Sequence, residues 1–183
     1  MRDGAVWAIE TAVNPAVIRV HVGHELTDRT IVTAPPAELA WPLAGLLELD
    51  AIRTIDLQRY RVRANLRPDT DRDATVLHIA EILTSAWGAP RPVVTDPGPR
   101  AFEVSYRGPR TVAESAEMAL GHRLLEAVFA VEGVSEAIAG DDLLLIKLGR
   151  LFGWTDVEPR VRSALSYAGR EDDGTPGSTS LDV

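Results

Sequence analysis

The sequence contains no cysteine in 183 residues. Disulfide bonds, zinc sites with thiolate ligands, cysteine nucleophiles and thiolate-held iron–sulfur clusters all need cysteine sulfur, so each is excluded. The sequence also lacks any run close to the roughly 18 consecutive apolar residues that a membrane-spanning helix needs. Residues 1–4 lack the apolar core of a signal peptide. We therefore expect a cytoplasmic protein without a membrane partner.

The sequence has fewer basic than acidic residues. The chain has 19 Lys and Arg against 27 Asp and Glu, which gives a formal net charge of −8. Proteins that bind nucleic acid displace counterions from phosphates and normally carry an excess of Lys and Arg. We therefore expect no nucleic-acid partner. Hydrophobic residues make up 45% of the chain and charged residues 25%, the proportions of a globular protein.

Two segments divide the chain. Residues 88–99 contain repeated Pro and Gly, which disfavour both helices and central strands. Residues 169–183 are polar and acidic, and they cannot bury enough apolar surface to offset the entropy lost on ordering. These breaks predict two folded units, at residues 1–89 and 90–168, followed by a disordered acidic tail at residues 169–183.

The two units are predicted to be divergent copies of one fold, because a shift of 82 positions aligns them without a gap. Identities are few, but residues of similar size and polarity coincide along the alignment. The aligned apolar residues of unit one are Leu46, Leu47, Leu49, Ile52, Val62, Ala64 and Leu66, and those of unit two are Val128, Phe129, Val131, Val134, Leu144, Ile146 and Leu148.

The residue pattern predicts the type of each element. Apolar residues alternate with Arg or Asn over residues 60–67, the period of a strand with one buried face. The counterpart at 143–146 is apolar on both faces, which indicates a strand covered from two sides or lying at a domain interface. Apolar residues recur at helical spacing over residues 157–168. Helices are also expected at residues 37–49 and 115–130.

The predicted fold class is therefore α+β, with two tandem two-layer units. Each unit has a mostly antiparallel sheet and two helices, in the order strands, helix, two strands, helix. The strands expected at the front of the units cover residues 6–11, 16–22 and 30–32 in unit one, and 92–95 and 102–106 in unit two. The second unit is thus predicted to be shorter at its front.

Two strings in the sequence resemble the Nfu/NifU N-terminal domain family. Unit one contains Glu10-Thr-Ala-Val-Asn-Pro15, then Val17-Ile-Arg-Val20 and Gly23; unit two contains Gly133-Val-Ser-Glu-Ala-Ile, Gly140-Asp-Asp142, residues 144–147, Trp154 and Val157-Glu-Pro159. The resemblance covers about residues 5–87 and 92–168. Arg72 stands where the family has a Trp in unit one, whereas Trp154 of unit two is expected to seal the entry to the last helix.

The family is associated with iron–sulfur cluster assembly and delivery, and its complete members carry a further domain with a CxxC motif. This sequence has no such motif. The resemblance implies a non-enzymatic scaffold or protein-interaction module beside iron–sulfur assembly, with cluster carriers or clients as protein partners, without a cofactor and without a cluster of its own. The alternatives are a small-molecule-binding regulatory protein that uses the cleft between the units, or an enzyme acting there.

Five arginines form a basic strip in this acidic protein: Arg53, Arg59, Arg61, Arg63 and Arg67. Strand alternation predicts that Arg61, Arg63 and Arg67 share one face. We predict these three as partner-binding residues for an acidic protein surface. The simpler interpretation is a solvated sheet face with ion pairs to Asp and Glu.

The remaining polar clusters are predicted to be structural, so no catalytic or metal-binding residue is expected. His21 and His24 are three apart on a predicted strand and would face opposite ways, as ordinary solvent or edge histidines. A calcium-loop spacing lacks the glycine and glutamate that such a loop needs, and it predicts a loop and a helix N-cap. Its residues are Asp69, Asp71 and Asp73. Asp141 and Asp142 are predicted to lie in a turn without a catalytic role.

Overall fold

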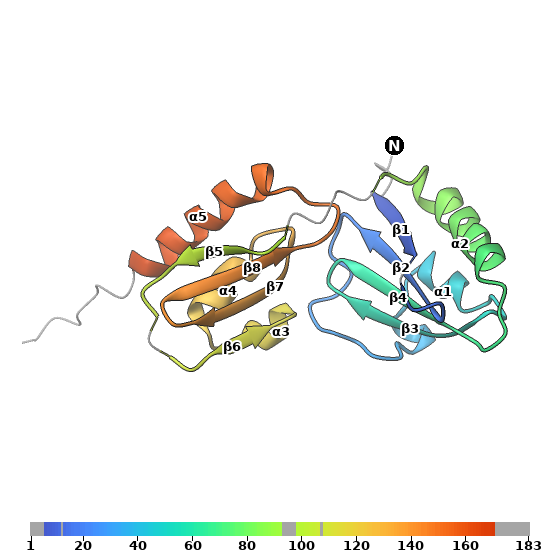
Figure 1. Cartoon of the computed structure of the whole chain (residues 1–183), viewed down its shortest axis with the longest axis horizontal. Helices are drawn as coiled ribbons and strands as arrows, with labels where there is room; N and C mark the ends of the chain where they lie inside the picture. Colours follow the sequence, from blue (N-terminus) through green and yellow to red (C-terminus); the bar gives the residue numbers. More distant parts are fainter. Residues whose placement is uncertain (1–5, 12, 93–97, 107, 171–183) are drawn as a thin grey trace, which may run out of the picture.

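The computed structural model describes residues 6–11, 13–92, 98–106 and 108–170. The chain forms two four-stranded antiparallel sheets with helices, so the predicted α+β class is confirmed (Figure 1). No helix in these ranges is long and apolar enough to cross a membrane. The predicted disordered tail falls mainly on residues 171–183, which lie outside the described ranges.

Unit one contains four strands, two α-helices and one 3-10 helix. In chain order they are β1 (Trp7–Thr11), β2 (Val17–Val22), η1 (Pro36–Glu38), α1 (Leu43–Leu46), β3 (Ile52–Gln58), β4 (Arg61–Leu66) and α2 (Arg72–Trp87). The strand order across the sheet is β1-β2-β4-β3. Ile18, Val62 and Leu83 are fully buried in one core, which joins one face of the sheet to α2.

Unit two shares three strands of this plan, but its fourth strand lies at the opposite edge of the sheet. Its elements are β5 (Arg100–Glu103), β6 (Thr111–Ala113), α3 (Ala116–Ala119), α4 (Arg123–Phe129), β7 (Val134–Gly140), β8 (Leu143–Leu148) and α5 (Trp154–Arg170). The strand order is β5-β8-β7-β6. A second core contains Phe102, Leu125, Leu144 and Val161 and lies between the sheet and helices α4 and α5.

The shift of 82 positions maps elements onto one another in the structure. It carries β3 onto β7 and β4 onto β8 at both ends, and the first residue of α2, Arg72, onto the first residue of α5, Trp154. The Arg72 side chain donates to the Val17 carbonyl at 3.4 Å, and Trp154 Nε1 donates to the Gly98 carbonyl at 3.0 Å. Two different side chains thus hold the start of the last helix to nearly the same place on each sheet.

Several predicted boundaries are wrong. The helix expected at 115–130 is two short helices, because Gly121 between them has a left-handed φ of 81°. The helix expected at 37–49 is reduced to η1 and the single turn of α1. The strand expected at 30–32 is one bridge, between Ile31 and Leu57. Helix α5 runs to Arg170, past the predicted end of unit two, and most of the strand expected at 92–95 lies outside the described residues.

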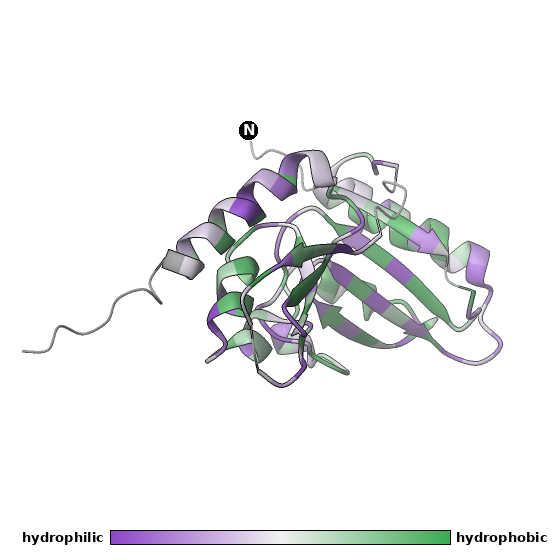
Figure 2. Ribbon diagram, turned by 60° about the vertical axis from the view of Figure 1, so that its left-hand side comes forward, coloured by the Kyte–Doolittle hydropathy of each residue, from purple (hydrophilic) through white to green (hydrophobic). Residues whose placement is uncertain are grey.

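Side chains alternate between a buried and an open face along the strands of both sheets. Figure 2 shows this alternation as green and purple bands along the strands of unit one, whereas β8 is hydrophobic on both faces except at Lys147. In β4 the buried residues are Val62, Ala64 and Leu66, and in β8 they are Leu144, Ile146 and Leu148. The opposite faces carry none of the helices of their own unit, so their side chains are available for contacts elsewhere.

Candidate functional site at the joint between the units

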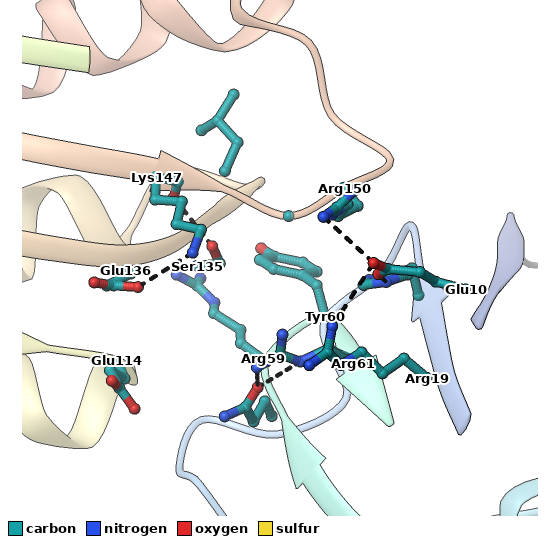
Figure 3. A pocket seen from close by; sticks show the side chains of 14 residues that line it. Glu10, Arg19, Arg59, Tyr60, Arg61, Glu114, Ser135, Glu136, Lys147 and Arg150 are labelled. Carbon is teal, nitrogen blue, oxygen red and sulfur yellow. Dashed lines mark hydrogen bonds and ion pairs between the residues drawn. The ribbon is translucent and has the colours of Figure 1, made fainter. Parts of the chain in front are cut away.

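The turn between β3 and β4 carries unit one onto unit two. The Tyr60 hydroxyl accepts a hydrogen bond from the Gly133 N–H at 2.9 Å, and the Tyr60 ring meets the Phe152 ring edge to face at 4.9 Å. Arg59 Nη1 donates to the Val134 carbonyl at 3.1 Å. Figure 3 shows Arg59 and Tyr60 reaching from unit one toward unit two. We call this region the joint.

Arg59 is a structural residue of the joint and does not belong to an exposed basic strip, so that part of the prediction is wrong. Only 5% of the residue is exposed. Its Nη2 donates to Glu25 at 3.0 Å, and its guanidinium lies 5.3 Å from the ring centres of Tyr60 and Phe129. A buried guanidinium needs such partners because desolvating its charge is costly.

A cavity of about 320 Å³ opens at the joint. We call it the joint pocket. It is lined by residues of both units (Figure 3). Its polar lining residues on β1, β2, β4 and β8 alternate with core residues, so they lie on the open faces of the sheets. Its charged lining consists of the cationic residues Arg19, Arg59, Arg61, Lys147 and Arg150 and the carboxylates Glu10, Glu114 and Glu136. The remaining lining includes His21, Gln58, Tyr60 and Ser135.

Glu10 is the main acceptor in the joint pocket. Its carboxylate lies 2.6 Å from His21 Nε2, 3.4 Å from Arg150 Nη2 and 3.7 Å from Arg19 Nη1. Burial by itself would raise the pKa of Glu10. The hydrogen bond from His21 and the charges of Arg150 and Arg19 outweigh burial, so the pKa lies below its ordinary value. Glu10 is therefore ionised at neutral pH, and Arg150 joins it to unit two.

His21 is buried, with 3% exposed, so the expectation of an ordinary solvent or edge histidine is wrong. Burial lowers the pKa of His21, and the contacts with Glu10 oppose that shift without cancelling it. His21 is thus a neutral imidazole that donates its Nε2–H to Glu10. His24 lies beyond the end of β2 and meets the Trp87 ring at 5.7 Å, and burial lowers its pKa too.

Arg61 is the cation in the joint pocket without a carboxylate partner among the described residues. Its Nε donates to Gln58 Oε1 at 2.7 Å, and its Nη2 bonds the same oxygen. Burial lowers the pKa of Arg61, and the like charges of Arg19 and Arg63 act in the same direction, while the carboxylates of Glu10 and Glu114 oppose the shift without cancelling it. Such a half-buried cation favours the approach of an anion from the pocket.

The structure separates the three arginines predicted to bind a partner. Arg61 and Arg63 share the open face of β4, and Arg63 is half exposed, 3.9 Å from Asp56. Arg67 follows the end of β4 and lines a different hollow with Asp71 and His78. The strand register adds Arg19, which lies directly opposite Arg63. Sequence reasoning missed Arg19 because pairing between strands cannot be seen from alternation along one strand.

A row of side chains across the open face is charged in unit one and apolar in unit two. In unit one a charged row crosses the open face through Glu10, Arg19, Arg63 and Asp56, which are paired in register. The row that crosses the open face of unit two, the apolar row, consists of Ala101, Leu145, Ile138 and Val112. The first three align with Arg19, Arg63 and Asp56 under the shift of 82 positions, so the two sheets present different open faces.

The apolar row is solvent-accessible. Leu145 is 37% exposed and Val112 39%, and Leu143 on the same face of β8 is 45% exposed. The expectation that the 143–146 strand is covered on both faces or lies at the interface is therefore wrong for this part of it. Leu144 and Ile146 face the core and are fully buried.

The acidic residues singled out in the sequence cap a helix or form a turn. Asp71 caps α2 by accepting from the Ala74 N–H at 3.0 Å, as predicted. Asp141 and Asp142 form the β7–β8 turn with left-handed φ values of 52° and 58°. Asp142 also accepts from the Tyr106 N–H at 3.0 Å. Within the described ranges, no group of three or more His, Asp or Glu is arranged to hold a metal ion.

The charged side chains of the joint pocket can bind a charged ligand. Among the described contacts at the joint, no hydroxyl group is hydrogen-bonded to a side chain that could act as its general base. Ser135 Oγ donates to the Lys147 carbonyl at 3.1 Å, and the Tyr60 hydroxyl is held by Gly133. The resemblance to the Nfu/NifU N-terminal domain family remains a prediction. Comparisons with family models, with curated proteins and with solved structures find no match for this chain.

Proposed function

We propose that this chain is a non-enzymatic protein-interaction module, a scaffold that holds a partner on the open faces of its two sheets. The apolar row of unit two is the observation that carries the proposal. Exposed apolar residues that are contiguous across a whole sheet mark a surface for another protein, since scattered ones would need no explanation. Register makes this row contiguous from β5 to β6.

The partner surface extends from the apolar row into unit one. Glu136 and Lys147 line the joint pocket and also a hollow formed with Ile138 and Leu145. The open faces of the two sheets therefore meet at the joint. A partner segment with both apolar and acidic side chains fits this surface, because Arg61 and Arg63 add positive charge on the side of unit one. Arg67, which lies beyond the end of β4, would contact the partner farther from the joint.

The resemblance to the Nfu/NifU N-terminal domain family supports partners among iron–sulfur cluster carriers and their clients. Without cysteine the chain cannot hold a cluster through thiolates. Its contribution is then to bring such proteins together, and the cluster chemistry belongs to the partners.

The test is recovery of partners from native lysate under anaerobic conditions, using tagged wild-type protein and two variants. Leu145→Glu places a charge in the centre of the apolar row. Leu77→Glu is the matched control, since Leu77 is 65% exposed on α2, away from both open faces. A combined charge reversal at Arg61 and Arg63 tests the basic part of the surface.

We expect cluster carriers or clients to be enriched by the wild type and by Leu77→Glu and to be lost with Leu145→Glu. Losing one buried Leu contact and burying a charge costs roughly 3 kcal/mol or more, a loss of over a hundredfold in affinity. Equal recovery with Leu145→Glu would contradict the proposed surface. A partner lost specifically with that variant but unrelated to iron–sulfur proteins would contradict the iron–sulfur role alone.

A second candidate function is small-molecule binding in the cleft between the units, and the joint pocket favours it. The cavity of about 320 Å³ lies at an interface between similar units, where ligand sites are common. A thermal-shift screen across metabolite classes tests this function, because a ligand that binds the folded state raises the melting temperature. A screen without any saturable shift would count against it.

A further inference from the structure

We propose that the joint pocket is a binding site for a small anion with carboxylate or phosphate oxygens, and that Arg61 is its principal binding residue. This inference rests on the second candidate function and specifies its ligand class. The site is composite, since Arg61 comes from unit one and Lys147 and Arg150 come from unit two.

The charge balance of the joint pocket is opposite to that of the whole chain. Five cationic side chains and three carboxylates line the pocket, whereas the protein has a net charge of −8. One of the five, Arg59, is paired with Glu25 outside the lining. A local excess of positive charge on an acidic protein concentrates anions at that place.

Arg61 is positioned to receive the anion. Gln58 Oε1 accepts from both Nε and Nη2 and so fixes the plane of the guanidinium. The remaining N–H groups, including both on Nη1, have no hydrogen-bond partner among the residues that the structure describes. A fixed planar guanidinium with a free edge matches the two oxygens of a carboxylate or phosphate.

The neighbouring cations can contribute to the same anion. Arg19 and Arg150 both face one oxygen of Glu10, at 3.7 and 3.4 Å, while His21 takes the other oxygen. A single carboxylate therefore serves two guanidinium groups and an imidazole, and Arg19, at 3.7 Å from it, can also face a ligand in the pocket. The cavity, about 320 Å³, suits a compact ligand such as a dicarboxylate, a tricarboxylate or a phosphate ester.

The test is calorimetric titration of the full chain with three probes: citrate, succinate and inorganic phosphate. Glycerol is the neutral control, and sodium chloride keeps the ionic strength constant. The variant is Arg61→Gln. The matched control is Arg63→Gln, because Arg63 is the next residue on the same face of β4 and does not line the joint pocket. Unfolding without ligand checks that both variants fold.

We expect saturable binding of at least one anionic probe by the wild type, weakened about tenfold or more by Arg61→Gln, since a charge-assisted hydrogen bond is lost. Arg63→Gln should bind within about twofold of the wild type if only screened, long-range charge is lost. The relative affinities for phosphate and for the carboxylates show which source of oxygens the site prefers.

A second variant gives a change of opposite sign. Glu10→Gln keeps an oxygen to accept from His21 but removes the charge that competes with the ligand for Arg19 and Arg150, so it should tighten anion binding. The inference is overturned if no anionic probe binds the wild type saturably, or if Arg61→Gln binds as the wild type does. Binding of a neutral metabolite in the thermal-shift screen, without anion binding, would overturn this inference and leave the second candidate function standing.

Discussion

Glu10 is the residue on which the contacts at the joint converge. It accepts a hydrogen bond from His21 of its own sheet and an ion pair from Arg150 of unit two. Its carboxylate is ionised and the imidazole is neutral, because burial lowers the pKa of His21 while the surrounding donors lower that of Glu10. The protonation of this pair is therefore linked to the stability of the joint.

Stability should fall on acidification from about pH 6.5, the pKa of a histidine in an unfolded chain. Below that pH the unfolded state takes up a proton that folded His21 resists, because the pKa of His21 is lowered by burial and by Arg61 and Arg150. Stability contributed by Glu10 is present above the carboxyl pKa of the unfolded chain, and it is lost as the pH falls through its lowered pKa in the folded state. Both effects have the same sign.

The measurement is the thermal midpoint between pH 4 and pH 8 for the wild type and for His21→Gln, which keeps a donor for Glu10 but does not titrate. The decline between pH 6.5 and 5 should be shallower in the variant. His24, whose pKa burial also lowers, contributes the part that remains. His78→Gln is the control, since His78 is exposed. An unchanged pH profile in His21→Gln would contradict this account of the pair.

At the scale of elements, Gly133 fixes the approach of β7 to the joint. Its φ of 99° is in the left-handed region, and its N–H donates to Tyr60. A Cβ at this position would lie 2.9 Å from the Phe152 ring and 3.2 Å from Val157. The position thus requires glycine for its backbone conformation and for the space that Phe152 takes.

Gly133→Ala should destabilise the protein by roughly 1–3 kcal/mol, because it combines a strained φ with a close contact. Urea unfolding measures the change. Gly169→Ala is the matched control, since Gly169 lies in α5 with open space around it, and alanine there should be neutral or stabilise by up to about 1 kcal/mol. If both variants unfold at the same urea concentration, the packing at Gly133 is not as described.

The sequence predicted the elements that have a strong period, and it missed those that depend on tertiary contacts. The apolar alternation of residues 60–67 and the shift of 82 positions located β4 and β8, and the expected order of elements placed one further strand, without bounds, before each of them. Strand β6 has only three residues and is held by pairing with β7, so it leaves no period to recognise. The break between α3 and α4 depends on Gly121, which inside a helical pattern is only a weak signal.

At the scale of the whole molecule, the two hairpin turns have diverged. Arg59 and Tyr60 of unit one are buried in the joint, whereas their counterparts Asp141 and Asp142 are exposed. The contact joins the turn of unit one to the opposite end of unit two, a head-to-tail arrangement. The acidic turn of unit two lacks the Arg and Tyr that make this contact, so it cannot repeat it.

The joint itself could not be predicted from the sequence, although a cleft between the units was expected. The sequence pattern placed Arg59 in the exposed basic strip. A local pattern cannot show that a residue in a turn is buried by contact with another unit. His21 was expected to be exposed because its cross-strand contact with Glu10 cannot be seen in a local pattern. Trp154 was placed correctly at the entry to the last helix, where its Nε1 bonds the Gly98 carbonyl at 3.0 Å.

The central claim is that the joint makes the two units one body with a shared surface, and differential scanning calorimetry of wild type and Arg59→Ala tests it most directly. We expect one cooperative transition for the wild type.

In Arg59→Ala the hydrogen bonds to Val134 and Glu25 are lost. Each charge-assisted bond is worth about 1.5–3 kcal/mol, so the transition should move to lower temperature and separate into two. Arg53→Ala, at an exposed position of β3, should leave the single transition unchanged. Two independent transitions in the wild type, or an unaltered transition in Arg59→Ala, would contradict the claim.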